Sequence, residues 1–207
     1  MFPATLPLFP LPNVVLFPGV YLPLHIFEPR YRALVRDALD SDRLIGMTLL
    51  KPGHEAEYEQ TPPIYPVGCA GLITHAERIE DGRFNIVLQG VERFRVTEED
   101  RSRSYRVATV ERLTEPRVDD PLALRSLRQR LEMQVNAMVE RAGKELSVPP
   151  SMSDADFVHA LAQYMEFDAL EKQALLEVDG LAPRASALCD LLEMKAMMGT
   201  IVSRGRH

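Results

Sequence analysis

Residues 6–39 read LPLFPLPNVVLFPGVYLPLHIFEPRYRALVRDAL. Prolines divide the apolar part of this segment into three short runs, Leu6–Leu11, Val14–Phe17 and Tyr21–Phe27. Proline fixes φ and lacks a backbone N–H donor, so the segment cannot form one long central strand or one long helix. It predicts short strands and tight corners that lead into a helix over residues 28–39. Pro29 falls in the first turn of that helix, where a missing N–H costs nothing.

The composition restricts the class of protein. A length of 207 residues suits one domain or two small ones, and 46% hydrophobic with 26% charged residues is ordinary for a globular protein. The net charge of −6 argues against a dominant surface for nucleic acid or anionic membranes, because such a surface needs clustered positive charge. No stretch approaches the roughly 18 apolar residues of a membrane span. We therefore expect a cytoplasmic protein without membrane contact.

The cysteines and the N-terminus agree with that expectation. Cys69 and Cys189 are the only two cysteines, and neither has a second cysteine at the CxxC spacing of metal and redox sites. We expect two free thiols in a reducing compartment. The start MFPATLPLFPLP lacks the basic region of a secretory signal, and prolines interrupt its apolar residues.

After the first helix the pattern is that of β-strands as far as about residue 116. Glu80-Asp81-Gly82 separates two alternating runs, and Asp-Gly in this position is a strong hairpin signal. Short strands joined by tight turns predict a twisted antiparallel sheet that curls into a small barrel. A polar, proline-rich loop is expected over residues 51–66. The predicted strands are Leu44–Leu50, Val67–Ile79, Arg83–Leu88, Val91–Thr97 and Tyr105–Leu113.

From residue 117 the pattern becomes helical. Asp120 and Pro121 predict the start of a helix that ends at Gly143, and Ser153 and Asp156 have the spacing of a capping box. The apolar stripes expected for the four helices are Leu124, Leu127, Leu131, Val135 and Met138; Phe157, Leu161 and Met165; Leu170, Ala174 and Val178, stopped by Gly180; and Leu188, Leu192, Met198 and Ile201. The sequence therefore predicts an α+β protein, with a β-rich part over residues 1–116 and a helical bundle over residues 117–207.

Three motifs near the N-terminus resemble a known family. The order Leu-Phe-Pro-Leu (8–11), Val-Leu-Phe-Pro-Gly (15–19) and Leu-Pro-Leu-His-Ile-Phe-Glu-Pro-Arg-Tyr (22–31) is similar to the start of the N-terminal substrate-binding domain of Lon-type ATP-dependent proteases. The segment Asp168–Met194 resembles the helical end of the same domain. The resemblance implies a PUA-like pseudo-barrel with one helix, followed by a C-terminal helical bundle. It also implies a non-catalytic domain that binds unfolded or apolar polypeptide segments, or that acts as an adaptor.

The chain lacks the catalytic motifs of the complete proteases of this family. It contains no GxxxxGK[ST] loop, no GxSxG elbow and no SxxK pair, so we expect no enzyme activity and no cofactor. His54-Glu55 and His75-Ala76-Glu77 begin like two zinc motifs, but neither motif is completed, and we expect no metal site.

Two groups of residues are candidates for contact with a partner. We expect a shallow apolar surface to bind unfolded polypeptide or a protein partner, although its residues could instead belong to the core, and an exposed strand edge could add to the binding. For Phe27, Glu28, Pro29, Arg30 and Tyr31 we favour a structural role over a ligand contact, because a strand-to-helix corner has to satisfy its backbone groups. The candidate contacts are Phe17, Pro18, Tyr21, Leu22 and Tyr65.

Two alternative functions stay open. The first is RNA binding by the predicted sheet, although interspersed acidic residues favour a mixed, solvated face, and nucleic acid is not the expected partner. The second is a small-ligand sensor with a pocket between sheet and helices. The arginines of the RNA hypothesis are Arg83, Arg93, Arg95, Arg101, Arg103 and Arg106.

Overall fold

A computed structural model describes residues 2–54, 62–100, 102–141, 148–149 and 151–204. These residues form two compact units. The first unit comprises residues 1–114 and 163–177, and the second comprises residues 115–162 and 178–207. Residues 163–177 lie beyond the boundary expected near residue 116, yet they belong to the first unit.

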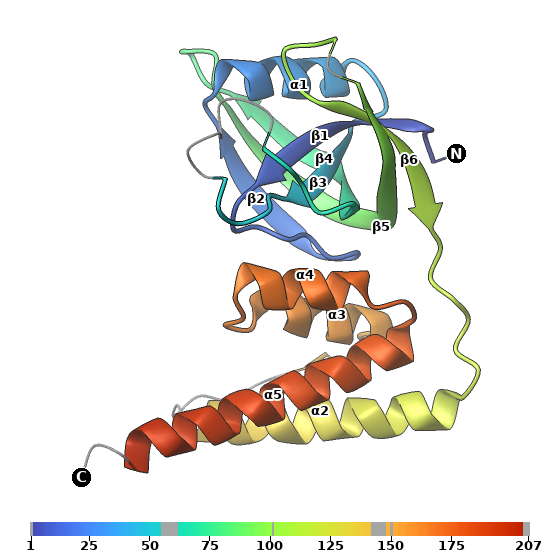
Figure 1. The fold of residues 1–207 in the computed structure, drawn as a ribbon, viewed down its shortest axis with the longest axis vertical. Helices are drawn as coiled ribbons and strands as arrows, with labels where there is room; N and C mark the ends of the chain where they lie inside the picture. Colours follow the sequence, from blue (N-terminus) through green and yellow to red (C-terminus); the bar gives the residue numbers. More distant parts are fainter. Residues whose placement is uncertain (1, 55–61, 101, 142–147, 150, 205–207) are drawn as a thin grey trace. The chain divides into compact units, whose positions relative to one another are not determined.

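Within the described residues, six strands of the first unit form one sheet in the order β2-β5-β4-β3-β1-β6 (Figure 1). Strand β5 also pairs with β6, so five strands close into a ring and β2 is added outside it. The sheet is mixed and not antiparallel as predicted, because β1 and β3 are parallel and are joined by a crossover through β2 and α1. The strands are β1 (Thr5–Leu11), β2 (Tyr21–Ile26), β3 (Leu44–Leu49), β4 (Val67–Arg78), β5 (Phe84–Asp100) and β6 (Val107–Leu113).

The run Val14–Phe17 is not a strand. It has no regular secondary structure, but Val15, Leu16 and Phe17 are buried, so an apolar run between two prolines serves as core without joining the sheet. Gly90 makes this packing fit. A Cβ atom at Gly90 would lie 2.0 Å from the Phe17 carbonyl oxygen, which no side chain can tolerate.

The predicted hairpin between β4 and β5 is present. Gly82 has a φ of +82° in its turn, a conformation that favours glycine. Beyond it, the two expected runs Arg83–Leu88 and Val91–Thr97 are one long strand, β5, with a register shift opposite Ala70 and Gly71. The shift is a bulge within a continuous strand.

The helix predicted over residues 28–39 is α1 (Pro29–Leu39), with Glu28 as the N-cap residue and proline in its first turn. The other helices are α2 (Pro121–Arg141), α3 (Asp154–Tyr164), α4 (Ala169–Glu177) and α5 (Leu181–Arg204). Helix α4 belongs to the first unit, and α2, α5 and most of α3 belong to the second. In α4 the predicted stripe Leu170, Ala174 and Val178 is wrong, because the buried residues are Gln173, Leu175 and Leu176.

Polar contacts order the helices of the second unit. Asp120 Oδ1 accepts hydrogen bonds from the backbone N–H groups of Leu122 and Ala123, both at 3.0 Å, as its predicted cap role requires. Ser153 caps α3 at the predicted position: the Asp156 N–H donates to Ser153 Oγ at 3.1 Å, and the Ser153 hydroxyl donates to Asp156 Oδ2 at 2.6 Å. The end expected for α2 at Gly143 lies outside the described residues.

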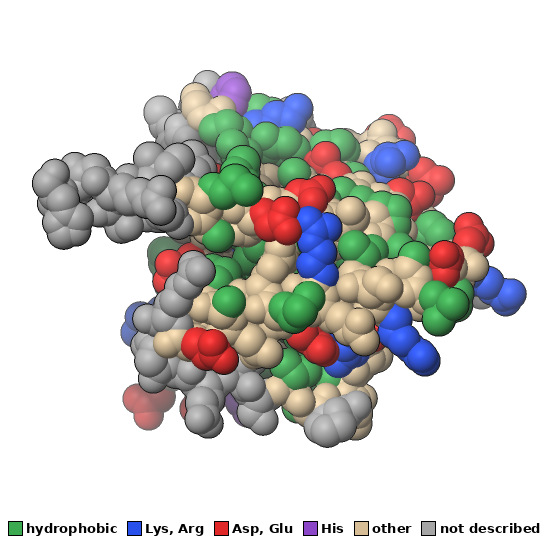
Figure 2. Space-filling view, turned by 90° about the horizontal axis from the view of Figure 1, so that it is seen from below, with side chains coloured by type: hydrophobic (Ala, Val, Ile, Leu, Met, Phe, Trp, Pro, Cys, Tyr) green, Lys and Arg blue, Asp and Glu red, His purple; other side chains and the backbone are tan. Residues whose placement is uncertain are grey.

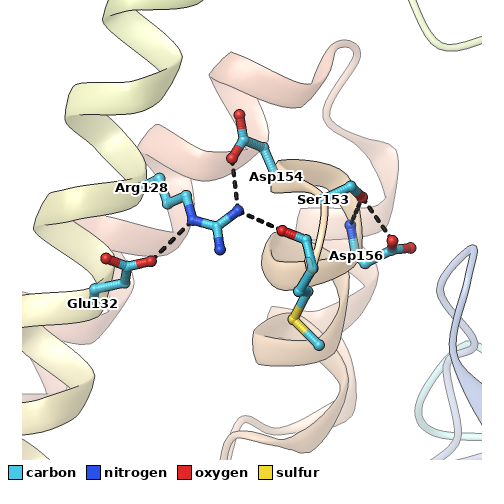
Figure 3. A network of polar contacts seen from close by, with 6 residues as sticks. Arg128, Glu132, Ser153, Asp154 and Asp156 are labelled. Carbon is cyan, nitrogen blue, oxygen red and sulfur yellow. Dashed lines mark hydrogen bonds and ion pairs between the residues drawn. The ribbon is translucent and has the colours of Figure 1, made fainter. Parts of the chain in front are cut away.

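Arg128 ties the start of α3 to α2 within the second unit (Figure 3). Its guanidinium donates to Asp154 Oδ1 at 2.7 Å, to Glu132 Oε1 at 2.9 Å and to the Met152 carbonyl oxygen at 2.9 Å. The hydrogen bonds to Asp154 and then to Glu132 raise the pKa of Arg128 above its usual value. Helices α2 and α5 lie side by side in the same direction, since the Leu127 carbonyl contacts Cys189 and Arg130 binds Glu193.

The α+β class predicted from the sequence is confirmed. In the part of the chain that the structure describes, no helix has both the length and the apolar composition needed to cross a bilayer.

Candidate functional site

The first unit contains a pocket of about 640 Å³ at the ends of β1 and β3. Because the two strands are parallel, their C-terminal ends meet at the same edge of the sheet, where crevices commonly form. The Leu50 N–H donates to the Leu11 carbonyl oxygen at 2.9 Å and holds the two ends together. The pocket is lined by Leu11, Pro12, Asn13, Leu50, Lys51, Pro52, His54, Asp168, Ala169 and Leu170.

The third wall of the pocket is the beginning of α4. Asp168 and Glu171 form a reciprocal cap there: the Glu171 N–H donates to Asp168 Oδ1, and the Asp168 N–H donates to Glu171 Oε2, both at 2.8 Å. This cap fixes the first turn of the helix, and with it Leu170, whose side chain is 47% exposed at the pocket.

Buried polar contacts hold α4 against the sheet. Gln173 Nε2 donates to the Val67 carbonyl oxygen at 2.9 Å, and Arg93 Nη1 donates to the Leu176 carbonyl oxygen at 3.0 Å. Gln173 and Arg93 are both buried. Lys172 Nζ donates to the Gln163 carbonyl oxygen at 2.6 Å, and burial lowers the pKa of this lysine. The helical wall is therefore fixed to the sheet that carries the other two walls.

Four of the lining residues are polar, and Lys51 is the most informative of them. Its Nζ lies 5.9 Å from the centroid of the Tyr65 ring. Among the residues that the structure describes, Lys51 has no ion-pair partner. Asn13, His54 and Asp168 complete the polar rim. The pocket thus combines an apolar interior with a cation that has no ion-pair partner in the described part of the chain.

None of the five contact residues predicted from the sequence is among those that line the pocket. Phe17 is fully buried and offers no surface to a peptide, so its side chain belongs to the core. Pro18 and Leu22 are half-buried, and Tyr65 is half-buried beside Lys51. Tyr21 is 52% exposed, and its carbonyl oxygen accepts a hydrogen bond from the Tyr164 hydroxyl at 3.2 Å. The structure therefore brings Tyr65 close to the pocket and groups Tyr21 with a second exposed tyrosine.

The edge strand β2 is poorly suited to strand addition. The Gly90 N–H donates to the Val20 carbonyl oxygen, and since inward and outward groups alternate along a ladder, the backbone groups of Tyr21, Pro23 and His25 point away from β5. Pro23 has no N–H to offer at the middle of this edge, and proline in such a place is a common protection against pairing with another chain.

The motif at residues 27–31 forms the corner between β2 and α1. Glu28 and Arg30 make an ion pair at 2.9 Å, and the Arg30 guanidinium lies 4.6 Å from the centroid of the Tyr31 ring. Tyr31 is buried against Phe9. Pro29 occupies the first turn of the helix, and Phe27 is 60% exposed. These contacts support a structural role for Glu28, Arg30 and Tyr31.

The arginines of the RNA hypothesis do not share one surface. Arg93 and Arg106 are buried, and Arg106 Nη2 donates to the Pro62 carbonyl oxygen. Arg83 pairs with Asp81 at 2.6 Å and Arg103 with Asp37 at 3.2 Å. Arg101 lies outside the described residues. Figure 2 views the molecule from below relative to Figure 1 and does not look onto the sheet; there too, basic and acidic side chains are interspersed among the described residues.

The pocket itself was missed from the sequence, because its walls come from three distant segments. One signal was available: Asp168 and Glu171 have the spacing of a capping box, which places the start of a helix after Asp168. The parallel pairing of β1 with β3, which brings the other two walls together, has no local signature.

The sequence of the chain matches the family model described as the substrate-binding domain of the ATP-dependent protease La (LON), over residues 5–194. The Lon protease of Cytophaga hutchinsonii is 27% identical over 209 residues, which cover 95% of this chain and 25% of that protein. The Lon protease of Trichlorobacter lovleyi is 29% identical over 222 residues, which cover 99% of this chain and 26% of that protein. The chain thus spans about a quarter of the length of these curated relatives.

Two solved structures have the same fold. A crystal structure of a Lon N-terminal domain protein from Xanthomonas campestris is 26% identical, with a TM-score of 0.58, and the match covers 89% of this chain and 96% of that one. The N-terminal domain of a Mycobacterium avium complex Lon protease has a TM-score of 0.66 at 18% identity, and the match covers 91% of this chain and 98% of that one. At 18% identity, the second match is evidence for the fold alone.

Proposed function

Since this chain belongs to the LON substrate-binding domain family, we propose that its first unit binds apolar segments of unfolded polypeptide and catalyses no reaction itself. The observation that carries the proposal is the pocket at the ends of β1 and β3. Its volume of about 640 Å³ is within the usual range for a binding pocket, roughly 300–1,000 Å³. Leu11, Leu50 and Leu170 supply an apolar lining.

The expected binding is weak and tolerant of sequence. Burial of one large apolar side chain contributes about 1.5–3 kcal/mol. Ordering an unfolded segment costs conformational entropy, so a ligand needs several such side chains before net binding results. A domain of this kind distinguishes exposed apolar segments from folded proteins, which keep those side chains inside.

We propose a second contact area around Tyr21. Its side chain is half exposed, and Tyr164 beside it is 67% exposed. Leu22 and Pro18 are partly accessible and complete the proposed area, whereas the partly accessible Tyr65 lies beside Lys51 at the pocket. Replacement of Tyr21 by Asp is expected to weaken polypeptide binding without unfolding the domain.

The cellular setting follows from the same proposal. The domain would act in the cytoplasm, either as an adaptor or as the substrate-binding part of a protease. Cys69 and Cys189 are free and buried, which suits a reducing compartment.

The test is fluorescence anisotropy of the protein with a labelled, permanently unfolded polypeptide, and with a single-stranded RNA oligomer as the parallel probe. Leu170→Glu places a negative charge in the pocket. Because Leu170 is the second residue of α4, where a carboxylate interacts favourably with the helix dipole, the variant should still fold. Leu122→Glu is the matched control, because Leu122 is the second residue of α2, also follows an Asp cap and lies outside the pocket.

Saturable polypeptide binding that Leu170→Glu weakens at least tenfold and Leu122→Glu leaves unchanged supports the proposal. Equal binding by both variants would move the site away from the pocket. Binding of RNA alone, falling steeply with salt, would replace the proposal by the RNA hypothesis.

A further inference from the structure

The charges at the rim of the pocket distinguish one kind of polypeptide segment from another. We propose that the pocket binds the C-terminal end of a polypeptide: apolar side chains fill the interior, and the free α-carboxylate lies at Lys51. This inference rests on the proposed function and narrows its substrate class from apolar segments in general to apolar chain ends.

The first step concerns the balance of charge. Asp168 is the acidic lining residue, and its carboxylate already accepts the Glu171 N–H at the positive end of α4. This hydrogen bond holds the Asp168 carboxylate at the helix cap, and no described ion pair joins it to Lys51. Lys51 has no ion-pair partner among the described residues, so its positive charge is the one left for a ligand to match.

The second step concerns hydrogen-bond donors. Pro12 and Pro52 form parts of two walls, and proline has no N–H. The Lys51 N–H is already used, because it donates to the Pro63 carbonyl oxygen at 2.9 Å. These three lining positions therefore offer no free backbone N–H to a carboxylate. Lys51 Nζ and the exposed side-chain amide of Asn13 are lining groups that can donate to a carboxylate.

The third step concerns the ligand. An internal apolar segment carries no formal charge and would leave Lys51 unmatched. The end of a chain that closes in apolar residues combines the two required features, an apolar surface and one negative charge, within a few ångströms. Recognition of a terminal carboxylate is a recurring mode of peptide binding.

The experiment uses one labelled ten-residue peptide with three C-terminal leucines, prepared as the free acid, as the C-terminal amide, and with four further Ser-Gly residues after the leucines. We expect the wild-type protein to bind the free acid about fivefold more tightly than the other two forms, the effect of one partly exposed charge pair. The difference should shrink as salt rises.

Variants assign the effect to Lys51. Lys51→Gln should bind all three peptides equally, and Lys51→Arg should restore the preference because it keeps the charge. Arg125→Gln, which removes one exposed positive charge from α2 in the second unit, is the control and should keep the wild-type preference.

The outcomes separate this inference from the proposed function. Equal binding of the three peptides by the wild-type protein, with loss of binding in Leu170→Glu, would overturn the inference and leave the proposed function standing. A preference for the free acid that persists in Lys51→Gln would also overturn it. If neither the peptides nor the unfolded polypeptide bound, both the inference and the proposed function would be refuted.

Discussion

Among the residues that the structure describes, each of the two units contains one fully buried arginine, and the two are stabilised differently. Arg93, on β5 of the first unit, donates to the Leu176 carbonyl oxygen in the last turn of α4. A cation there interacts favourably with the negative end of the helix dipole. Arg184 of the second unit lies in the first turn of α5, at the end where a cation is unfavourable.

Arg184 accordingly has a larger set of partners. Its Nη1 lies 3.1 Å from Glu115 Oε2 and 3.0 Å from His159 Nε2, and its Nη2 donates to the Val178 carbonyl oxygen at 2.7 Å. In the first unit the fully buried arginine attaches one helix to the sheet through its hydrogen bond to the Leu176 carbonyl oxygen. A small helical unit instead uses a charged cluster to join its chain segments.

The largest expected loss of stability follows from replacement of Arg184, the centre of this charged cluster. Arg184→Met leaves a carboxylate and a buried imidazole without their cation, and loss of one partner of a buried charge network costs about 3–5 kcal/mol. We expect amide hydrogen exchange, measured by mass spectrometry, to accelerate in α3 and α5 and to stay slow in the sheet. Arg130→Met removes an exposed pair with Glu193 and is the control, with a much smaller expected effect on exchange. Equal acceleration of exchange in the two variants would show that the buried cluster stabilises the second unit no more than an exposed ion pair does.

The corresponding change in the first unit is expected to be smaller. Arg93→Met leaves the Leu176 carbonyl oxygen without this donor, and an unsatisfied buried group costs about 1–3 kcal/mol. Exchange should accelerate in α4 first. Arg95→Met, an exposed neighbour on β5, should leave exchange unchanged. If Arg93→Met proves as costly as Arg184→Met, the contrast between the two units fails.

The two buried cysteines predict how the free energy of unfolding changes at high pH. Burial raises the pKa of Cys69 from 9.0 to about 12, and burial also raises the pKa of Cys189. Above pH 9 the unfolded chain loses the Cys69 proton while the folded protein keeps it. The free energy of unfolding therefore falls with rising pH, by about 1.4 kcal/mol per unit for this group. Urea unfolding of the wild type and Cys69→Ala between pH 8 and 11 should show a steeper decline in the wild type. Parallel curves would contradict the raised pKa.

The smallest effects come from the helix caps, and here the two units should agree. Asp168→Ala removes the cap of α4 in the first unit, and Ser153→Ala removes the cap of α3 in the second. Each should lower the free energy of unfolding by about 1 kcal/mol, measured by chemical denaturation. A cap that cost several times more in one unit would mean that its helix also supports a long-range contact.

The same caps show what the sequence could predict. Asp120 and Ser153, the proline at the start of α1 and the Gly82 turn are local signals, and the structure confirms each of them. Their partners lie within a few residues, so spacing alone identifies them.

Features that depend on distant partners could not be predicted in this way. Val14–Phe17 is as apolar as a strand but is buried without pairing. Gln173 interrupts the expected stripe of α4, because a polar side chain can be buried where the Val67 carbonyl oxygen accepts its hydrogen bond. The pocket depends on the β1–β3 register and on the attachment of α4, so its lining residues have no common pattern in the sequence.

The interleaving of the two units along the chain has a consequence for synthesis on the ribosome. Strand β1 pairs with β6 about a hundred residues later, and the wall that α4 gives the pocket comes from residues 168–170. Domains usually fold from the N-terminus as they emerge. Here the first strand made must wait for most of the translated chain before its unit is complete. A nascent chain stalled before residue 163 would therefore expose the pocket-forming strands without the helix that closes one side, and would itself present apolar surface to chaperones and proteases.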